Sequence, residues 1–229
     1  MHYFTIVRHG QTVNNVLNIC QSRTGGELTE HGINMAKSLG RHLKTESFSR
    51  IFSSDLHRCR QTTQGILSEM TVATPPVEFT RVLRERDYGD WEFLSNSVVQ
   101  EKRVEMNLPP NKMLHVDVPN GESYEDCKKR AEQFFLQLCQ IVDECEDTRT
   151  ENILAVSHGA FIVILLDYIR SSPEVQLKVE TKDPMPRRGM ENTARTRFAI
   201  NQLKPGNNEK RQFTVTHMFN VEHLLDSKI

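Results

Sequence analysis

The sequence predicts an α/β protein, a three-layer sandwich in which helices cover both faces of a mainly parallel central sheet. Short apolar stretches typical of buried strands alternate with segments whose apolar residues recur at helical spacing. Two of the strand-like stretches, residues 5–10 (TIVRHG) and 154–159 (LAVSHG), end in the same His-Gly pair. Since the carboxyl ends of parallel strands meet at one edge of a sheet, we expect a ligand site at that edge.

The 229 residues are expected to form one domain, 1–229, because no Gly-, Ser- or Pro-rich linker and no repeat divides the sequence. Lys plus Arg (29) and Asp plus Glu (30) leave a formal net charge of −1. That balance provides no global field to attract nucleic acid or an anionic membrane, so an anion site must be local. Five cysteines without metal-type spacing, and no apolar signal segment at the start, predict a cytoplasmic protein.

The first half of the chain alternates between strand-like and helix-like segments. Strands are expected over residues 3–7, 50–53 and 75–79, helices over 28–43 and 55–70, and a loop or short helical turn over 11–22. Ser54 or Asp55 can cap the helix that begins near residue 55. Arg58 would lie in the first turn of that helix, where the helix dipole favours acidic groups. Arg58 therefore needs an anion nearby, either a carboxylate or a ligand.

The second half of the chain continues this alternation. A helix is expected over 123–145 and strands over 153–157, 196–203 and 212–220. The apolar run 153–169 has nearly the length of a membrane span, but Ser157-His158-Gly159 interrupts it, which predicts a strand, a turn and a helix. Residues 90–121 contain three prolines and are expected to form an irregular excursion over the sheet edge, without a long element.

Four cationic or imidazole side chains follow the predicted strands. Arg8 and His9 come directly after the first strand, and His158 follows the strand over 153–157. Arg58 lies at the loop-to-helix junction after the second strand. In a parallel sheet these side chains could face one another across a pocket. Two permanently charged guanidinium groups beside two imidazoles suit a dianion such as phosphate.

His9 is also a candidate nucleophile. A neutral imidazole can attack phosphorus when a hydrogen bond fixes its far nitrogen. The departing alkoxide then needs a proton, and Glu85, which follows the third strand, could supply it. The flanking Arg84 and Arg86 would favour the ionised carboxylate if they pointed at it, whereas burial beside phosphate would favour the protonated form.

Each candidate also has a structural interpretation that the residues alone leave open. These interpretations are a strand-end hydrogen bond for His9, a buried turn for His158, an ion pair of Arg58 with Asp55 or Glu30, an ion pair of Glu85 with Arg84 or Arg86, and a solvated loop for Gln21. The positions of the side chains around the strand ends decide between the two sets of interpretations.

Five motifs occur in an order that resembles the histidine phosphatase superfamily, in its phosphoglycerate mutase-like branch. They are RHGQT with Asn15, SSDLHR ending in Arg58, LRERDYGDWE, NGES at 120–123 and SHGA at 157–160. RHG alone is a weak signal, but the five ordered motifs lie within residues 3–194 and together are specific. Within the superfamily, SSDLHRCRQTTQGIL and GESYEDCKKR are most similar to members that act as fructose-2,6-bisphosphatases.

The resemblance implies a phosphohistidine mechanism. His9 would accept the phosphoryl group, and Glu85 would protonate the leaving group and later activate water. The remaining implied site residues are Arg8, Arg58 and His158 on the phosphoryl oxygens, Asn15 assisting them, and Gln11, Thr12 and Gln21 at the entrance. The resemblance implies no metal or organic cofactor. The implied partner is a small phosphorylated metabolite, with neither nucleic acid nor membrane, and the oligomeric state stays open.

The leading expectation is a phosphomonoester hydrolase for small phosphometabolites, with fructose 2,6-bisphosphate as first candidate. The alternatives are a phosphoglycerate mutase or bisphosphoglycerate phosphatase, and a non-catalytic regulator that binds a phosphorylated ligand. Mutases place adjacent Arg residues in the stretch corresponding to 92–120, where this chain has only Lys102-Arg103. The chain departs from the family pattern at Ser22, Phe93, Asn120 and Val163. These positions surround the expected pocket, so they bear on the substrate more than on the chemistry.

Overall fold

The computed structural model describes residues 1–107, 114–146, 148–181, 190–204, 206 and 209–225. Within them, seven strands form one sheet in the order β3-β2-β4-β1-β6-β7-β5. The strands are β1 His2–Arg8, β2 Arg50–Ser54, β3 Val77–Thr80, β4 Asn152–Ser157, β5 Val175–Val179, β6 Arg195–Ile200 and β7 Arg211–Asn220. The α-helices are α1 Val13–Val16, α2 Glu30–His42, α3 His57–Leu67, α4 Asn96–Glu105, α5 Tyr124–Asp143, α6 Gly159–Ser171 and α7 Glu222–Leu225.

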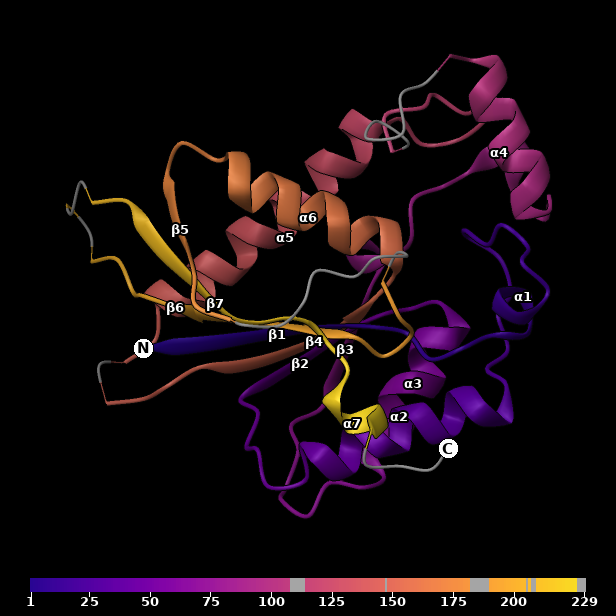
Figure 1. The fold of residues 1–229 in the computed structure, drawn as a ribbon. Helices are drawn as coiled ribbons and strands as arrows, with labels where there is room; N and C mark the ends of the chain where they lie inside the picture. The colour runs from indigo at the N-terminus through magenta and orange to yellow at the C-terminus, as the bar shows by residue number, and fades with distance from the viewer. Residues whose placement is uncertain (108–113, 147, 182–189, 205, 207–208, 226–229) are drawn as a thin grey trace.

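The sheet is mixed but mainly parallel. Strands β3, β2, β4 and β1 run parallel to one another, and β5 runs parallel to β7. Only β6, among the described strands, pairs antiparallel with its neighbours, β1 and β7. Helices cover both faces, with α5 and α6 on one and α2, α3 and α7 on the other (Figure 1). The predicted three-layer α/β fold is confirmed.

The two central strands, β1 and β4, are apolar on both faces, as expected for parallel strands covered by helices. Phe4 and Ile153 face the larger core, which they share with α5 and α6. Val7 and Val156 face the second core, under α2 and α3. The register sets Val7 opposite Val156 and Arg8 opposite Ser157. The residues that follow, His9 and His158, therefore leave the sheet side by side.

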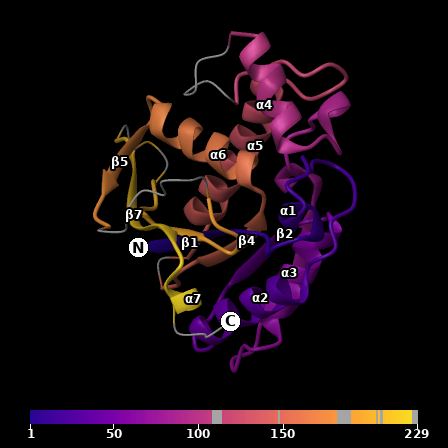
Figure 2. The ribbon, with the colours of Figure 1, turned by 45° about the vertical axis from the view of Figure 1, so that its right-hand side comes forward.

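Three elements differ from the sequence-based expectation, namely helix α4, strand β5 and the four-residue helix α7. Helix α4 occupies residues 96–105, within the stretch expected to lack a long element. It buries only Val99, so it shows none of the apolar periodicity that identifies a helix in sequence. Figure 2 shows it on the side of α5 and α6. Strand β5 was not expected either, because most of its side chains are exposed at the sheet edge.

The start of α3 also corrects a prediction. Its N-cap residue is Leu56, which makes no side-chain capping hydrogen bond. Neither Ser54 nor Asp55 caps the helix from the expected position. Ser54 Oγ instead lies 2.8 Å from His158 Nε2, and Asp55 binds Arg84 through both carboxylate oxygens, at 2.6 Å each. Both side chains therefore bind residues far away in the sequence and do not cap the helix.

The apolar run that begins at residue 153 forms β4 and then α6, with the break at His158 that the sequence predicts. In the described part of the chain, no helix combines the length and the apolar character needed to cross a bilayer.

Candidate active site

His9 follows directly on β1 and is 4% exposed. Its Nδ1 lies 2.8 Å from the carbonyl oxygen of Gly10. A carbonyl oxygen can only accept a hydrogen bond, so Nδ1 carries the proton and Nε2 keeps its lone pair. Burial lowers the pKa of His9 well below its usual value, and the charges of Arg58 and Arg8 lower it further, against a smaller opposing effect of the Gly10 carbonyl. His9 is therefore a neutral imidazole with a free nucleophilic nitrogen.

Gly10 fixes the turn that carries this imidazole. Its N–H donates to Thr62 Oγ1 at 2.9 Å, which ties the turn to α3. A Cβ at position 10 would lie 2.6 Å from the carbonyl oxygen of Gly32, at the start of α2. Since real Cβ atoms do not approach a carbonyl so closely, glycine is required here. The turn after β1 is thus packed directly against both helices of one face.

His158 follows β4, and its ring centroid lies 5.2 Å from that of His9. Its Nδ1 accepts a hydrogen bond from Arg58 Nε at 3.1 Å, so the ring proton is on Nε2 and donates to Ser54 Oγ at 2.8 Å. Burial, followed by the charge of Arg58, lowers the pKa of His158 well below its usual value. Both nitrogens of this neutral ring have partners within the chain, so the ring orients Arg58.

Arg58 has no exposed surface. Besides its bond to His158, its Nη2 donates to the carbonyl of Ser22 at 2.7 Å and its Nη1 to the carbonyl of Gly25 at 3.4 Å. A guanidinium group has five N–H donors. Within the described residues, these three contacts occupy three of them, which leaves donors for an anion. Arg58 forms neither of the carboxylate pairs considered as alternatives from the sequence.

Arg8 supplies a second buried guanidinium. Its Nη1 donates to the carbonyl of Met190, and its Nε is buried without a hydrogen-bond partner among the described residues. A Cβ added to Gly159 would lie 3.6 Å from Arg8 Nε, so the side chain runs along the first turn of α6. Burial lowers the pKa of Arg8, and the charge of Glu85 opposes that shift. Arg8 and Arg58 together place two buried positive charges close enough to His9 to act on its ring.

Glu85 lies at the N-terminus of α6 and is 7% exposed. Its Oε1 accepts from the backbone N–H groups of Arg86 at 2.9 Å and Phe161 at 3.0 Å, and its Oε2 from that of Ala160 at 3.2 Å. The first N–H groups of a helix lack intrahelical partners and attract negative charge. Neither flanking arginine pairs with this carboxylate: Arg84 binds Asp55, and Arg86 donates to backbone carbonyls such as that of Glu122.

The residues expected at the entrance fall into two groups. Thr12 caps α1, and its Oγ1 donates to Gln21 Oε1 at 3.0 Å. A Cβ on Gly26 would meet both Gln21 Nε2 and Arg58 Cδ within 3 Å, so the Gln21 amide lies beside Arg58. That Nε2 is buried and has no partner among the described residues. Gln11, by contrast, accepts from Thr29 Oγ1 at 2.9 Å and is directed toward the start of α2.

Asn15 belongs to a hydrogen-bonded chain that the sequence did not reveal. Its Oδ1 accepts from Asn192 Nδ2 at 3.1 Å, and the same Asn192 nitrogen donates to the carbonyl of His9 at 3.0 Å. Asn192 and Ser54 are site residues that the sequence did not indicate. Ser54 directly follows the strand predicted over 50–53 and is the last residue of β2, so its position at a strand end was a usable signal. Asn192 lies in no strand or helix and has no such signal.

Among the described residues, no group of three or more His, Cys, Asp or Glu side chains is arranged to hold a metal ion. All five cysteines are free thiols with buried side chains.

The family model of the histidine phosphatase superfamily (branch 1) matches residues 4–179. The chain is 35% identical over 157 residues to fructose-2,6-bisphosphatase TIGAR of Xenopus tropicalis, covering 67% of this chain and 55% of that protein. For the TIGAR of Bos taurus the identity is 29% over 248 residues, covering 88% of this chain and 89% of that protein. A 2,3-bisphosphoglycerate-dependent phosphoglycerate mutase of Afipia carboxidovorans is 31% identical over 185 residues, and the match covers 79% of this chain and 87% of that protein.

Among solved structures, a phosphoglycerate mutase from Bacillus anthracis superimposes with a TM-score of 0.76. The match covers 100% of this chain and 97% of that one, at 21% identity. At this identity the likeness supports the fold alone.

The lowered pKa values of His9 and His158 predict acid sensitivity. As pH falls through about 6.5, the unfolded chain takes up protons at these residues while the folded rings stay neutral, so stability is present above that pH and lost below it. Well below pH 6.5, each neutral buried ring should lower the free energy of unfolding by about 1.4 kcal/mol for every unit that the pH decreases. His158→Asn should reduce the pH slope of the unfolding free energy by about that amount in urea titrations. The matched control is His31→Asn at an exposed position, and an unchanged slope in His158→Asn would contradict the assignment.

Proposed function

The chain belongs to the histidine phosphatase superfamily, and we propose that it hydrolyses small phosphorylated metabolites through a phosphohistidine on His9, with fructose 2,6-bisphosphate as the first candidate substrate. The observation that carries the proposal is the tautomer of His9. Its Nδ1–H is held by the Gly10 carbonyl, which directs the Nε2 lone pair toward a reacting group. The buried guanidinium groups of Arg8 and Arg58 provide the charge that a phosphate dianion needs.

In the first step, His9 Nε2 forms a bond to phosphorus while the bond from phosphorus to the ester oxygen breaks. Glu85 gives its proton to the departing alkoxide. In the second step Glu85 takes a proton from water, the water oxygen attacks phosphorus, and the P–N bond to His9 breaks to release inorganic phosphate. Arg8 and Arg58 stabilise the charge on the transferring oxygens in both steps, with His158 holding Arg58 in place.

Glu85 can act as the acid only if its carboxyl group is held close to the ester oxygen. In the unliganded site that carboxyl group accepts three backbone hydrogen bonds, from the N–H groups of Arg86, Ala160 and Phe161. These bonds fix both carboxyl oxygens at the start of α6.

The hydrogen bonds around the site suggest roles for the other predicted residues. Asn15 and Gln21 would contact the phosphoryl oxygens, and the buried Gln21 Nε2 beside Arg58, which has no partner among the described residues, supports this role. Thr12 would hold Gln21, and Gln11 would lie at the outer entrance, next to α2. The preference for fructose 2,6-bisphosphate rests on the similarity to the two TIGAR proteins. Five free cysteines support a cytoplasmic location.

Three residues that bear on substrate choice have distinctive local geometry. Phe93 is 61% exposed and has a φ of 69°, a conformation that costs an aromatic residue free energy. Asn120 also has a positive φ, and its Nδ2 donates to Asp90. Arg103, part of the pair that could serve a mutase, has its guanidinium carbon 5.9 Å from the ring centre of Trp91.

His9→Ala should abolish turnover while inorganic phosphate still binds, because Arg8 and Arg58 remain. Rapid-quench labelling with a radiolabelled phosphoester should give an acid-labile phosphoenzyme in the wild type and none in the variant. Calorimetric titration with phosphate checks the binding. Appreciable residual turnover would remove His9 from the nucleophile role, and no phosphoenzyme in either wild type or Glu85→Gln would favour a non-catalytic regulator.

Glu85→Gln should slow hydrolysis of alkyl phosphates by about 10²-fold or more, the range in which general acids contribute. Aryl phosphates should be slowed far less, since their leaving groups need little protonation. The two classes are compared by kcat on the same preparation. Equal slowing of both would mean that Glu85 is not the acid.

A panel of phosphometabolites should rank fructose 2,6-bisphosphate first by kcat/KM, and the same preparation should show no phosphoglycerate mutase activity. Mutase activity above the phosphatase rate would instead support the alternative suggested by the Afipia relative.

A further inference from the structure

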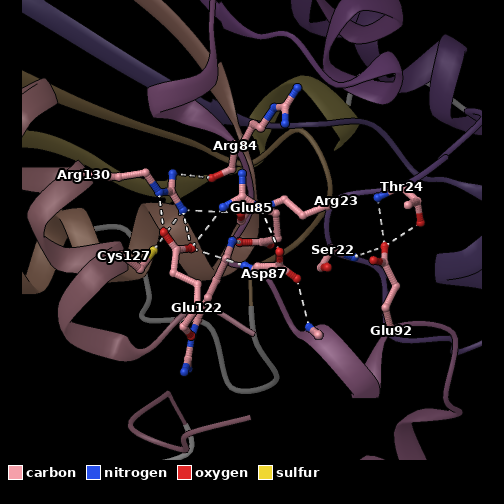
Figure 3. A network of polar contacts seen from close by, with 12 residues as sticks. Ser22, Arg23, Thr24, Arg84, Glu85, Asp87, Glu92, Glu122, Cys127 and Arg130 are labelled. Atoms are coloured by element: carbon pink, nitrogen blue, oxygen red, sulfur yellow. Dashed lines mark hydrogen bonds and ion pairs between the residues drawn. The ribbon is translucent and has the colours of Figure 1, made fainter. Parts of the chain in front are cut away.

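The segment that carries Glu85 has little secondary structure of its own. It follows a short 3-10 turn, Arg81–Leu83, and continues without a regular element to residue 88. Its backbone is held instead by one side chain of α5. Arg130 donates to the carbonyls of Val82 at 2.7 Å, Arg84 at 3.0 Å and Glu85 at 3.4 Å. A single guanidinium thus holds three carbonyls of the acid-bearing segment. Figure 3 shows Arg130 beside Arg84 and Glu85.

Arg130 is in turn fixed by Glu122. Its Nε and Nη2 donate to Glu122 Oε1 and Oε2, both at 2.6 Å, in the bidentate geometry that gives the strongest pairs. The two side chains are only 18% and 11% exposed. Burial is the largest single effect and would raise the pKa of Glu122. The hydrogen bond and charge of Arg130, the charge of Arg23 and the N–H of Asp87 together outweigh it and keep that pKa below its usual value. The pair is therefore charged on both sides.

Glu122 also contacts two chain segments that carry residues of the candidate site. Its Oε2 accepts from the backbone N–H of Asp87 at 3.3 Å, just beyond Glu85. The same oxygen lies 3.4 Å from Arg23 Nη2. Arg23 belongs to the loop over residues 20–26, in which the carbonyls of Ser22 and Gly25 accept from Arg58. One carboxylate thus connects the segment of the acid with the loop that holds Arg58.

The loop has a second support that does not involve Glu122. Glu92 Oε1 accepts from Ser22 N at 3.0 Å, Thr24 N at 2.9 Å and Thr24 Oγ1 at 2.7 Å. Figure 3 shows Glu92 on the far side of this loop from Glu122. Loss of the Glu122 contact should therefore leave the loop in place. The segment with Glu85 depends far more on the Glu122–Arg130 pair.

We propose that Glu122, acting through Arg130, is a positioning residue that sets where the carboxyl of Glu85 stands relative to the ester oxygen. This inference rests on the proposed function, in which Glu85 is the acid. The carboxyl oxygens are anchored at the start of α6, and the pair holds the backbone from which the side chain extends. Since a misplacement of about 1 Å can cost 10²-fold in rate, loosening this backbone should weaken proton donation specifically.

The test compares an alkyl phosphate, glycerol 1-phosphate, with an aryl phosphate, p-nitrophenyl phosphate, on full-length variants. Glu122→Gln keeps the shape of the side chain and removes its charge. It should lower kcat for the alkyl ester about 10-fold to 100-fold, with KM and the aryl rate changed by less than about 3-fold. Glu125→Gln, the same change at an exposed position of α5, is the matched control and should retain both wild-type rates.

Three further variants test whether Glu122 acts through Glu85, through the guanidinium of Arg130 and through its own charge. Glu85→Gln/Glu122→Gln should be no slower on the alkyl ester than Glu85→Gln alone, since both changes act on one step. Arg130→Lys, which keeps the charge but loses the fork, should resemble Glu122→Gln. Glu122→Asp keeps the charge on a shorter side chain and should recover part of the alkyl rate, and it replaces Glu122→Gln in every comparison if thermal melting shows that variant to be unfolded.

Equal loss on both esters in the folded Glu122 variant, or additive loss in the double variant, would overturn the positioning role. If Glu85→Gln itself slows both esters equally, the acid assignment fails and the proposed mechanism with it. A selective effect of Glu85→Gln without a selective effect of the Glu122 variant would refute this inference alone.

Discussion

Arg58 is a permanently charged group with no exposed surface, and the residues around it supply the hydrogen bonds that its burial requires. Removing a guanidinium from water costs several kcal/mol unless its donors find partners. The partners here are the carbonyls of Ser22 and Gly25 and the Nδ1 lone pair of His158. None of these three partners is an anion, and the carboxylates of Glu85 and Glu92 act on Arg58 through charge without a hydrogen bond to it. A buried cation with no direct anionic partner among the described residues favours the binding of a phosphate dianion.

Burial, together with this same charge, keeps the two histidines neutral. Burial and the nearby guanidinium groups lower the pKa values of His9 and His158, so both rings are neutral. Their tautomers differ because their partners differ: a carbonyl beside Nδ1 of His9, and a guanidinium N–H beside Nδ1 of His158. One ring therefore presents a free nitrogen and can serve as a nucleophile, while the other holds an arginine.

The start of α6 binds the negatively charged group of the site, next to Arg8. Its first N–H groups bind the Glu85 carboxylate, and Arg8 runs along the same turn. The Glu122–Arg130 pair stabilises the irregular segment from which Glu85 extends. The acid is thus placed by two independent supports, one on its carboxyl group and one on its backbone. Such double support is what a group needs when its distance from a leaving oxygen sets a rate.

The sequence alone determined the strands other than β5, most helices and the chemical groups of the site, since apolar periodicity and strand-end motifs are local properties. It failed at α4, which buries a single residue, at the four-residue helix α7, and at the edge strand β5, whose alternation of apolar and polar residues covers only five positions. Only the tertiary structure decided the tautomers of His9 and His158, the partners of Arg58 and the Glu122–Arg130 support. These depend on contacts between residues far apart in the chain, such as the 100 positions between Arg58 and His158. Local sequence patterns do not predict such contacts, because the packing of the whole sheet and its helices determines which distant residues meet.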